Sequence, residues 1–174
     1  DAWLDGVQQP TDAHDGFRLA LDLASGEHQL TVTALCRYSR TGEGLHRFVD
    51  PADGKVYLYT QFETADARRM YGCFDQPDLK ATFELTVKAP EDWKVYSNSR
   101  PAEHGPGGDG FTTWHFAPTP PISSYITALV AGEFHVHTGE ITSIKGVVPA
   151  DFVCRESMAP YLEAGQMGTT TQRG

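Results

Sequence analysis

The sequence predicts an all-β domain of antiparallel strands, packed as a sandwich or in a similar arrangement. Apolar and polar residues alternate with a period of two over several short runs, which is typical of half-buried strands. Turn residues separate these runs at the short intervals expected in all-β domains. With 174 residues, the chain is long enough for one domain with its own core.

Three runs show the alternation most clearly, and each is predicted to be a half-buried strand. In the last of them, Phe83, Leu85 and Val87 share one face, while the residues between them are polar. The runs are residues 17–23 (FRLALDL), 28–38 (HQLTVTALCRY) and 82–88 (TFELTVK).

Turn signals place the connections between strands. Asp53-Gly54 separates two short β-rich runs within residues 46–60, so a hairpin is expected there. Ser25-Gly26 separates the first two strands, and residues 104–110 (HGPGGDG) are expected to form a flexible loop. Residues 119–139 contain a further turn and one or two strands.

One short helix is expected near the end, from about Glu156 to Ala164. Met158, Tyr161 and Leu162 would lie on its apolar side, and Pro160 would be tolerated in its first turn. We therefore assign residues 1–162 to the β domain and residues 163–174 to a tail or linker.

Composition and residue spacing exclude some classes of partner and indicate the state of the cysteines. The net charge of −9 argues against nucleic acid and against an anionic membrane, because both are bound through Lys and Arg. No apolar run approaches the roughly 18 residues that span a bilayer. The three cysteines include no CxxC pair, which favours reduced thiols in a cytoplasmic protein over a single disulfide with one free thiol.

The common local motifs of catalytic sites do not occur in the sequence. HExxH, GxSxG, the P-loop and GxGxxG are all absent. His135 and His137 lie two residues apart on an expected strand, so they could chelate a metal with a third ligand from elsewhere. The favoured interpretation is that both histidines lie on the solvent face, and no metal ligand is assigned.

Residues 60–87, called here the connection, are unusually rich in charged residues at their start. Gln61 and Glu63 lie two apart at the end of an extended run, so their side chains are expected to point the same way. A carboxylate beside an amide can receive an ammonium group. The alternative is a solvated strand end whose carboxylate forms an ion pair with Arg68 or Arg69.

Several ordered blocks of the sequence resemble a known family. They are YSRTGEGLHRF (38–48), YTQFE (59–63), ARR-x-x-x-CFDQPDLKA-x-F (67–83) and FAPTPPISSYITALVAGEFH (116–135). From about residue 17 to residue 162 the chain resembles the N-terminal domain of the M1 family of zinc aminopeptidases, and it is most similar to bacterial members of actinobacterial type.

The resemblance implies a β-saddle domain that packs against a thermolysin-like catalytic domain of the same polypeptide. That domain carries a GAMEN-type sequence and an HExxH motif with a distal Glu, which together bind the substrate N-terminus and the zinc. Glu63 corresponds to the acidic residue that holds the free α-amine of the peptide substrate. Gln61 corresponds to a residue that lines the pocket for the first side chain.

The sequence also departs from the family. It contains neither HExxH nor a GAMEN-like sequence, so we expect no zinc and no activity in this piece alone. Family members have strands before the position of Asp1, so we expect an incomplete sheet with an exposed edge. A structural role through ion pairs and turn hydrogen bonds is expected for Arg68, Arg69, Asp75 and Asp78.

Two other classes of function stay open at this point. One is a non-catalytic M1-like β module that serves as a protein-binding scaffold, for instance by sheet-edge pairing. The other is a small independent metalloprotein that uses His135 and His137.

Overall fold

A computed structural model describes residues 1–144 and 146–163. It confirms the all-β prediction, since the regular structure consists of antiparallel strands and a few short 3-10 helices. The strands are β1 (Ala2–Leu4), β2 (Val7–Gln8), β3 (Leu30–Val32), β4 (Gly44–Val49), β5 (Val56–Gln61), β6 (Leu85–Pro90), β7 (Lys94–Ser97), β8 (Pro101–Gly108), β9 (Phe111–Phe116), β10 (Leu129–Gly132), β11 (Phe134–Ser143) and β12 (Gly146–Arg155). The 3-10 helices are η1 (Thr11–Ala13), η2 (Ala67–Arg69), η3 (Ser124–Ile126) and η4 (Glu156–Tyr161).

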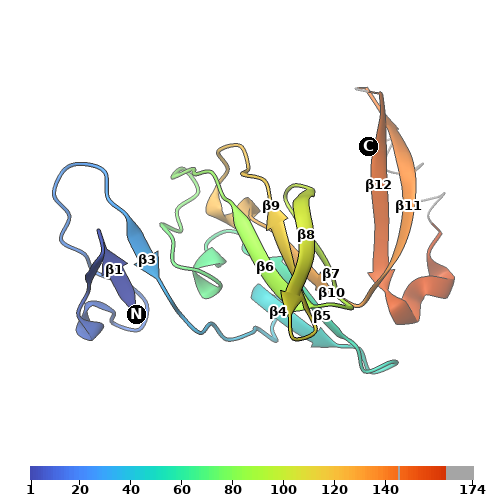
Figure 1. Cartoon of the computed structure of the whole chain (residues 1–174), viewed down its shortest axis with the longest axis horizontal. Helices are drawn as coiled ribbons and strands as arrows, with labels where there is room; N and C mark the ends of the chain where they lie inside the picture. Colours follow the sequence, from blue (N-terminus) through green and yellow to red (C-terminus); the bar gives the residue numbers. More distant parts are fainter. Residues whose placement is uncertain (145, 164–174) are drawn as a thin grey trace.

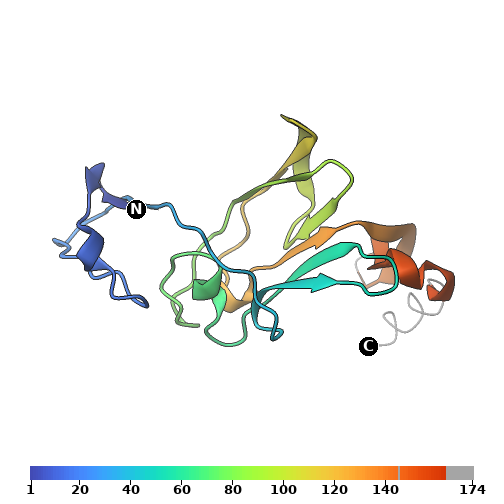
Figure 2. The same cartoon turned by 90° about the horizontal axis from the view of Figure 1, so that it is seen from below.

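The strands form four sheets, arranged along an elongated molecule. A small sheet of order β2-β1-β3 lies at one end and the β11–β12 hairpin lies at the other (Figure 1). Between them lie the sheet β4-β5-β10-β7 and the sheet β6-β9-β8. Figure 2 shows that these two sheets splay apart from a common side.

The core fills the space between the two middle sheets. Its buried members come from both sheets, and partly buried tryptophans and aliphatic side chains pack around them. They are Leu58, Ala89, Val95, Phe116, Leu129 and Ala131. Burying a leucine, valine or phenylalanine side chain contributes about 1.5–3 kcal/mol relative to leaving it in water, so these contacts hold the two sheets together.

The hairpin predicted around Asp53-Gly54 is confirmed. Strands β4 and β5 pair in continuous register from Val49 opposite Val56 to Gly44 opposite Gln61. Gly54 has a φ of 74°, a left-handed conformation that glycine adopts without steric cost. The hairpin therefore places the end of β5, with the YTQFE sequence, in the middle of the molecule.

The strand predicted over 17–23 is wrong. The Asp15 carboxylate accepts the backbone N–H groups of Phe17 and Arg18, and such local bonds compete with a strand ladder. The strand predicted over 28–38 shrinks to β3, which pairs with β1. The apolar face of 82–88 is confirmed, because Phe83, Leu85 and Val87 are partly buried and the intervening residues are exposed.

Two further predictions need correction. The expected loop over 104–110 is largely strand, because β8 extends to Gly108 and leaves a tight turn with positive φ at Asp109 and Gly110. The expected helix over 156–164 is instead the 3-10 helix η4, with Pro160 near its end. A proline cannot donate the backbone hydrogen bond that would continue an α-helix. Apart from Glu163, the proposed tail lies outside the described residues.

Candidate functional site

The candidate site lies at the end of strand β5. This strand is interior to its sheet, pairing with β4 on one side and with β10 on the other. Leu129 continues the contact by donating its N–H to Thr60 Oγ1 at 2.9 Å. The β4–β5 ladder ends at the pair of Gly44 and Gln61. The chain therefore leaves the sheet directly after a strand that is hydrogen-bonded to a neighbour on each side.

Side chains alternate between core and solvent across this strand end. Phe62 is 2% exposed, whereas Gln61 and Glu63 on either side of it are exposed. Glu63 is joined to Thr64 by a cis peptide bond. Within the described residues, neither Gln61 nor Glu63 has a side-chain hydrogen bond or ion pair. Both polar groups are therefore free to meet a ligand or another domain.

Of the alternative interpretation, a solvated strand end with an ion pair from Glu63 to Arg68 or Arg69, the solvated end agrees with the exposure of Glu63, whereas the ion pair is not formed. Arg69 Nε donates to Asp66 Oδ1 at 2.6 Å instead. The side chain of Arg68 contacts no carboxylate in the part of the chain that the structure describes. The cations closest in sequence thus leave the Glu63 carboxylate unpaired.

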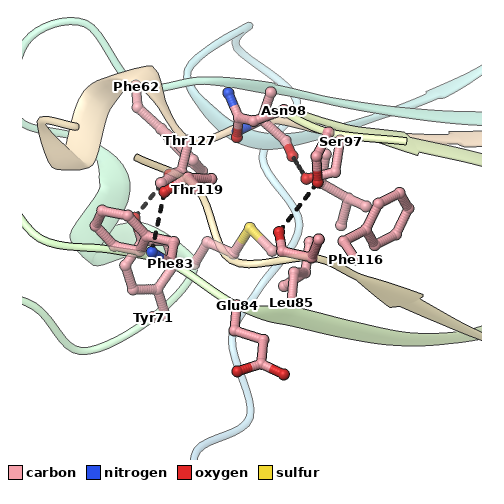
Figure 3. A pocket seen from close by; sticks show the side chains of 15 residues that line it. Phe62, Tyr71, Phe83, Glu84, Leu85, Ser97, Asn98, Phe116, Thr119 and Thr127 are labelled. Atoms are coloured by element: carbon pink, nitrogen blue, oxygen red, sulfur yellow. Dashed lines mark hydrogen bonds between the residues drawn. The ribbon is translucent and has the colours of Figure 1, made fainter. Parts of the chain in front are cut away.

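A cavity of about 240 Å³ lies behind Phe62, between the splayed sheets. Its lining is mainly apolar, with Phe62, Tyr71 and Phe83 gathered on one side and Phe116 on the other (Figure 3). Glu84 points away from the cavity. Because Phe62 faces inward while Gln61 and Glu63 face out, the cavity and the polar strand end lie on opposite sides of the chain.

The connection is anchored to the segment around η3. Asp75 Oδ1 accepts the hydroxyl of Ser124 at 2.7 Å, and Asp75 Oδ2 accepts the N–H of Arg68 at 3.1 Å. The hydroxyl of Ser123 donates to the carbonyl of Pro77. The bonds from Ser123 and Ser124 join two stretches that are about 50 residues apart along the chain, whereas the Asp75–Arg68 bond lies within the connection.

Tyr71 adds a third anchor between the same two stretches. Its hydroxyl lies 2.7 Å from Thr127 Oγ1 and 3.3 Å from the carbonyl of Ser124. Burial raises the pKa of Tyr71 to about 12, so the hydroxyl keeps its proton at neutral pH. Sequence reasoning missed Tyr71, Ser123, Ser124 and Thr127, although all four lie between residues 71 and 127 in or next to blocks that carry the family resemblance.

The four charged residues expected to act structurally divide into two groups. Asp75 and Arg69 do so through the bonds just described. Arg68 contributes its backbone N–H, and Asp78 its backbone carbonyl, which accepts the N–H of Lys80 at 3.0 Å. Over residues 1–144 and 146–163, the side chains of Arg68 and Asp78 have no polar partner.

A metal site is not formed by the described residues. His135 and His137 lie on β11, opposite Cys154 and Phe152 of β12, and the ring of His137 packs against Phe152. No group of three His, Cys, Asp or Glu side chains in residues 1–144 and 146–163 is arranged to hold a metal ion.

Comparison with known proteins decides the family. The model of the peptidase M1 N-terminal domain matches residues 7–126. The chain belongs to the peptidase M1 family. It is 49% identical to aminopeptidase N of Streptomyces lividans over 158 residues, which is 90% of this chain and 18% of that protein.

Other relatives of this M1 domain come from distant organisms. It is 36% identical to aminopeptidase N of Acetobacter pasteurianus over 68% of the chain and 34% of that protein. It is 34% identical to aminopeptidase N of Bos taurus over 70% of the chain and 12% of that protein. The M1 domain thus spans between about an eighth and a third of the length of these relatives.

Two further observations concern the cysteines and the helices of the M1 domain. Cys36, Cys73 and Cys154 are free thiols; burial raises the pKa of Cys73 to about 11, so this thiol stays protonated at neutral pH. None of the helices in the described part of the chain is long and apolar enough to cross a membrane.

Proposed function

We propose that this M1 domain contributes recognition of the substrate α-amine to a zinc aminopeptidase that removes N-terminal residues from peptides. Glu63 accepts hydrogen bonds from the ammonium group, and Gln61 lines the pocket for the first side chain. The observation that carries the proposal is that Glu63 stands exposed, with no ion pair in the described residues, just beyond the end of β5, an interior strand of its sheet. The identity of the relatives as aminopeptidases supports it.

The chemistry of the site suits an exopeptidase. A carboxylate accepts charge-assisted hydrogen bonds from an ammonium group, and these are about twice as strong as neutral ones. A peptide whose amine is acetylated would leave the carboxylate unpaired, so it would be rejected. The site thereby selects a free N-terminus.

Hydrolysis itself belongs to the catalytic domain of the same polypeptide, where zinc would act as the Lewis acid. The described residues of this chain form no zinc site. Because the sequence contains neither HExxH nor a GAMEN-like sequence, we expect the 174-residue piece to be inactive by itself. The unpaired cysteines favour a cytoplasmic location for the complete enzyme.

The test is a comparison of Glu63→Ala and Glu63→Gln in the polypeptide that includes the catalytic domain. Both should raise KM for a free peptide about tenfold or more, because a charged hydrogen bond contributes about 1.5–3 kcal/mol. Glu84→Ala, which also removes an exposed carboxylate, is the matched control. Unchanged kinetics in the Glu63 variants would contradict the role assigned to Glu63.

A second candidate is a non-catalytic M1-like module that binds other proteins. It is favoured by the exposed apolar side chains of residues 1–38, such as Phe17 at 92% and Leu35 at 104% exposure. Zinc analysis of the complete polypeptide separates the two: about one zinc per chain supports the peptidase, and none supports the scaffold.

A further inference from the structure

The turn that carries Glu63 is closed by a neighbouring ion pair. The backbone N–H of Asp66 donates to the carbonyl of Phe62 at 3.0 Å. The carboxylate of Asp66, whose side chain is 18% exposed, accepts Arg69 Nε at 2.6 Å. The N–H of Arg69 also donates to the carbonyl of Asp66 at 3.1 Å. Residues 62 to 66 are thus tied at both ends, with Glu63 between the ties.

Arg69 is in turn held against the first residue of β4. A Cβ added to Gly44 would lie 3.1 Å from both Cβ and Cδ of Arg69, which is tighter than ordinary van der Waals contact, so the Arg69 side chain would have to shift. Gly44 is buried, has a φ of 70° and pairs with Gln61. The absence of a side chain at Gly44 therefore lets the stem of Arg69 lie across the strand end.

These contacts form a closed circuit. It runs from Gln61 across the strand pair to Gly44, through the side chain of Arg69 to Asp66, and back along the chain to Phe62. We call Gly44, Asp66 and Arg69 the clamp. Both proposed ligands of the peptide, Gln61 and Glu63, lie within this circuit or next to it.

We propose that the clamp positions Glu63 for the substrate α-amine, with Arg69 as a positioning residue that does not touch the substrate. This inference rests on the proposed function. A misplacement of about 1 Å in a binding group can cost roughly a hundredfold in rate. Hydrogen bonds that fix both ends of the turn would therefore keep the Glu63 carboxylate in the position that binds the amine. The clamp also keeps the Arg69 guanidinium on Asp66, so the Glu63 carboxylate stays free for an ammonium group.

The structural half of the proposal is tested on the present chain by amide hydrogen exchange. Arg69→Ala should speed exchange at the Asp66 amide about two- to fivefold, since the turn loses a partly solvent-exposed ion pair. Arg68→Ala removes the adjacent arginine, which has no polar side-chain partner in the described residues, and should leave that amide unchanged. Equal exchange in the wild-type chain and in Arg69→Ala would overturn the clamp.

Glycine variants give an independent test with a matched control. Gly44→Ala combines a strained positive φ with a tight approach to the Arg69 side chain, whereas Gly54→Ala has a similar φ of 74° and no atom within 4 Å of the added Cβ. Gly44→Ala should speed Asp66 exchange, and Gly54→Ala should not. If the Asp66 amide exchanges at the same rate in both variants, the contact between Gly44 and Arg69 does not position the turn.

The functional half is tested by kinetics of the complete polypeptide. Arg69→Ala should raise KM about tenfold with a smaller change in kcat, and Arg69→Lys, which retains the stem and the charge, should recover much of the loss. A tenfold fall in kcat with an unchanged KM in Arg69→Ala would contradict a positioning role. Glu63→Ala separates the two proposals, because it should raise KM without speeding exchange at the Asp66 amide. If KM is unchanged in Glu63→Ala, the proposed amine site is wrong, and the exchange experiment on Arg69→Ala still tests the clamp.

Discussion

In the β4–β5 hairpin, Tyr57 and Leu58 are buried at 2% and 6% exposure, whereas Phe17 and Leu35 in the N-terminal segment (residues 1–38) are almost fully exposed. Both regions carry short runs of apolar residues between turn signals. The hairpin lies in a four-stranded sheet with a second sheet packed on its face. The N-terminal segment contains a three-stranded sheet of two- and three-residue strands, well apart from the middle sheets (Figure 1).

The comparison shows that alternation creates an apolar face but does not supply the surface that covers it. Burial of apolar area is the main favourable contribution to folding, and a small sheet with one uncovered face gains little of it. The hairpin has such a cover, and its strand end can therefore hold Gln61 and Glu63 in defined positions.

The largest expected contrast is between two phenylalanines. Phe62→Ala should destabilise the domain by about 3–5 kcal/mol, because Phe62 is 2% exposed and lines the intersheet cavity. Phe17→Ala, at 92% exposure, should change the free energy of unfolding by less than about 0.5 kcal/mol. Urea titration of both variants measures the difference. Similar losses in the two variants would mean that the N-terminal segment is buried in solution.

A smaller loss is expected where the connection meets η3. Asp75→Ala should lower the free energy of unfolding by about 1–3 kcal/mol, because the Ser124 hydroxyl and the Arg68 N–H lose their acceptor. Asp78→Ala, which removes a carboxylate without a polar partner in the described residues, should cost less than about 0.5 kcal/mol. Thermal melts compare the two. No stability loss in Asp75→Ala would show that the anchor contributes nothing.

Asp50, in the turn of the hairpin, should make the stability of the domain decrease at acidic pH. The Asp50 pKa is lowered by hydrogen bonds from the Ser157 hydroxyl and the Ala52 N–H and by the charge of Arg155. A lowered folded-state pKa stabilises the fold above the unfolded value of about 3.9, and this contribution is lost as the pH falls through the folded value. Melting temperatures from pH 6 to pH 3 should therefore fall less steeply in Asp50→Asn than in the wild-type chain. Parallel curves would contradict this assignment.

The smallest effect is expected in the N-terminal segment, with the opposite sign. The His28 pKa is raised by the hydrogen bond to Asp5 at 2.7 Å and by the Ala24 carbonyl. A raised folded-state pKa stabilises this segment below the unfolded value of about 6.5, and the contribution is lost as the pH rises through the folded value. Amide exchange at Gln29, whose N–H donates to Asp5, should quicken above neutral pH beyond its intrinsic rate. His28→Phe should abolish the extra pH dependence, and a persistent dependence would exclude His28 as its source.

Local patterns were enough to predict the hairpin and the apolar face of residues 82–88. These features depend on strand alternation and on an Asp-Gly turn, both of which act over a few residues. The strand over 17–23 could not be excluded in this way, because the Asp15 side chain competes for its N–H groups. The loop predicted at 104–110 failed because glycine-rich residues can extend when β9 offers a ladder.

By itself the sequence determined that the chain is all-β, that it resembles the M1 N-terminal domain and that Gln61 and Glu63 lie at the end of an extended run. Tertiary structure alone decided that Arg69 bonds to Asp66 rather than to Glu63, that Gly44 makes room for the stem of Arg69, and that Asp75 anchors Ser124. The physical reason is that ion pairs and close contacts depend on distances in space, and a charged residue can reach several partners until the fold places one of them within bonding distance.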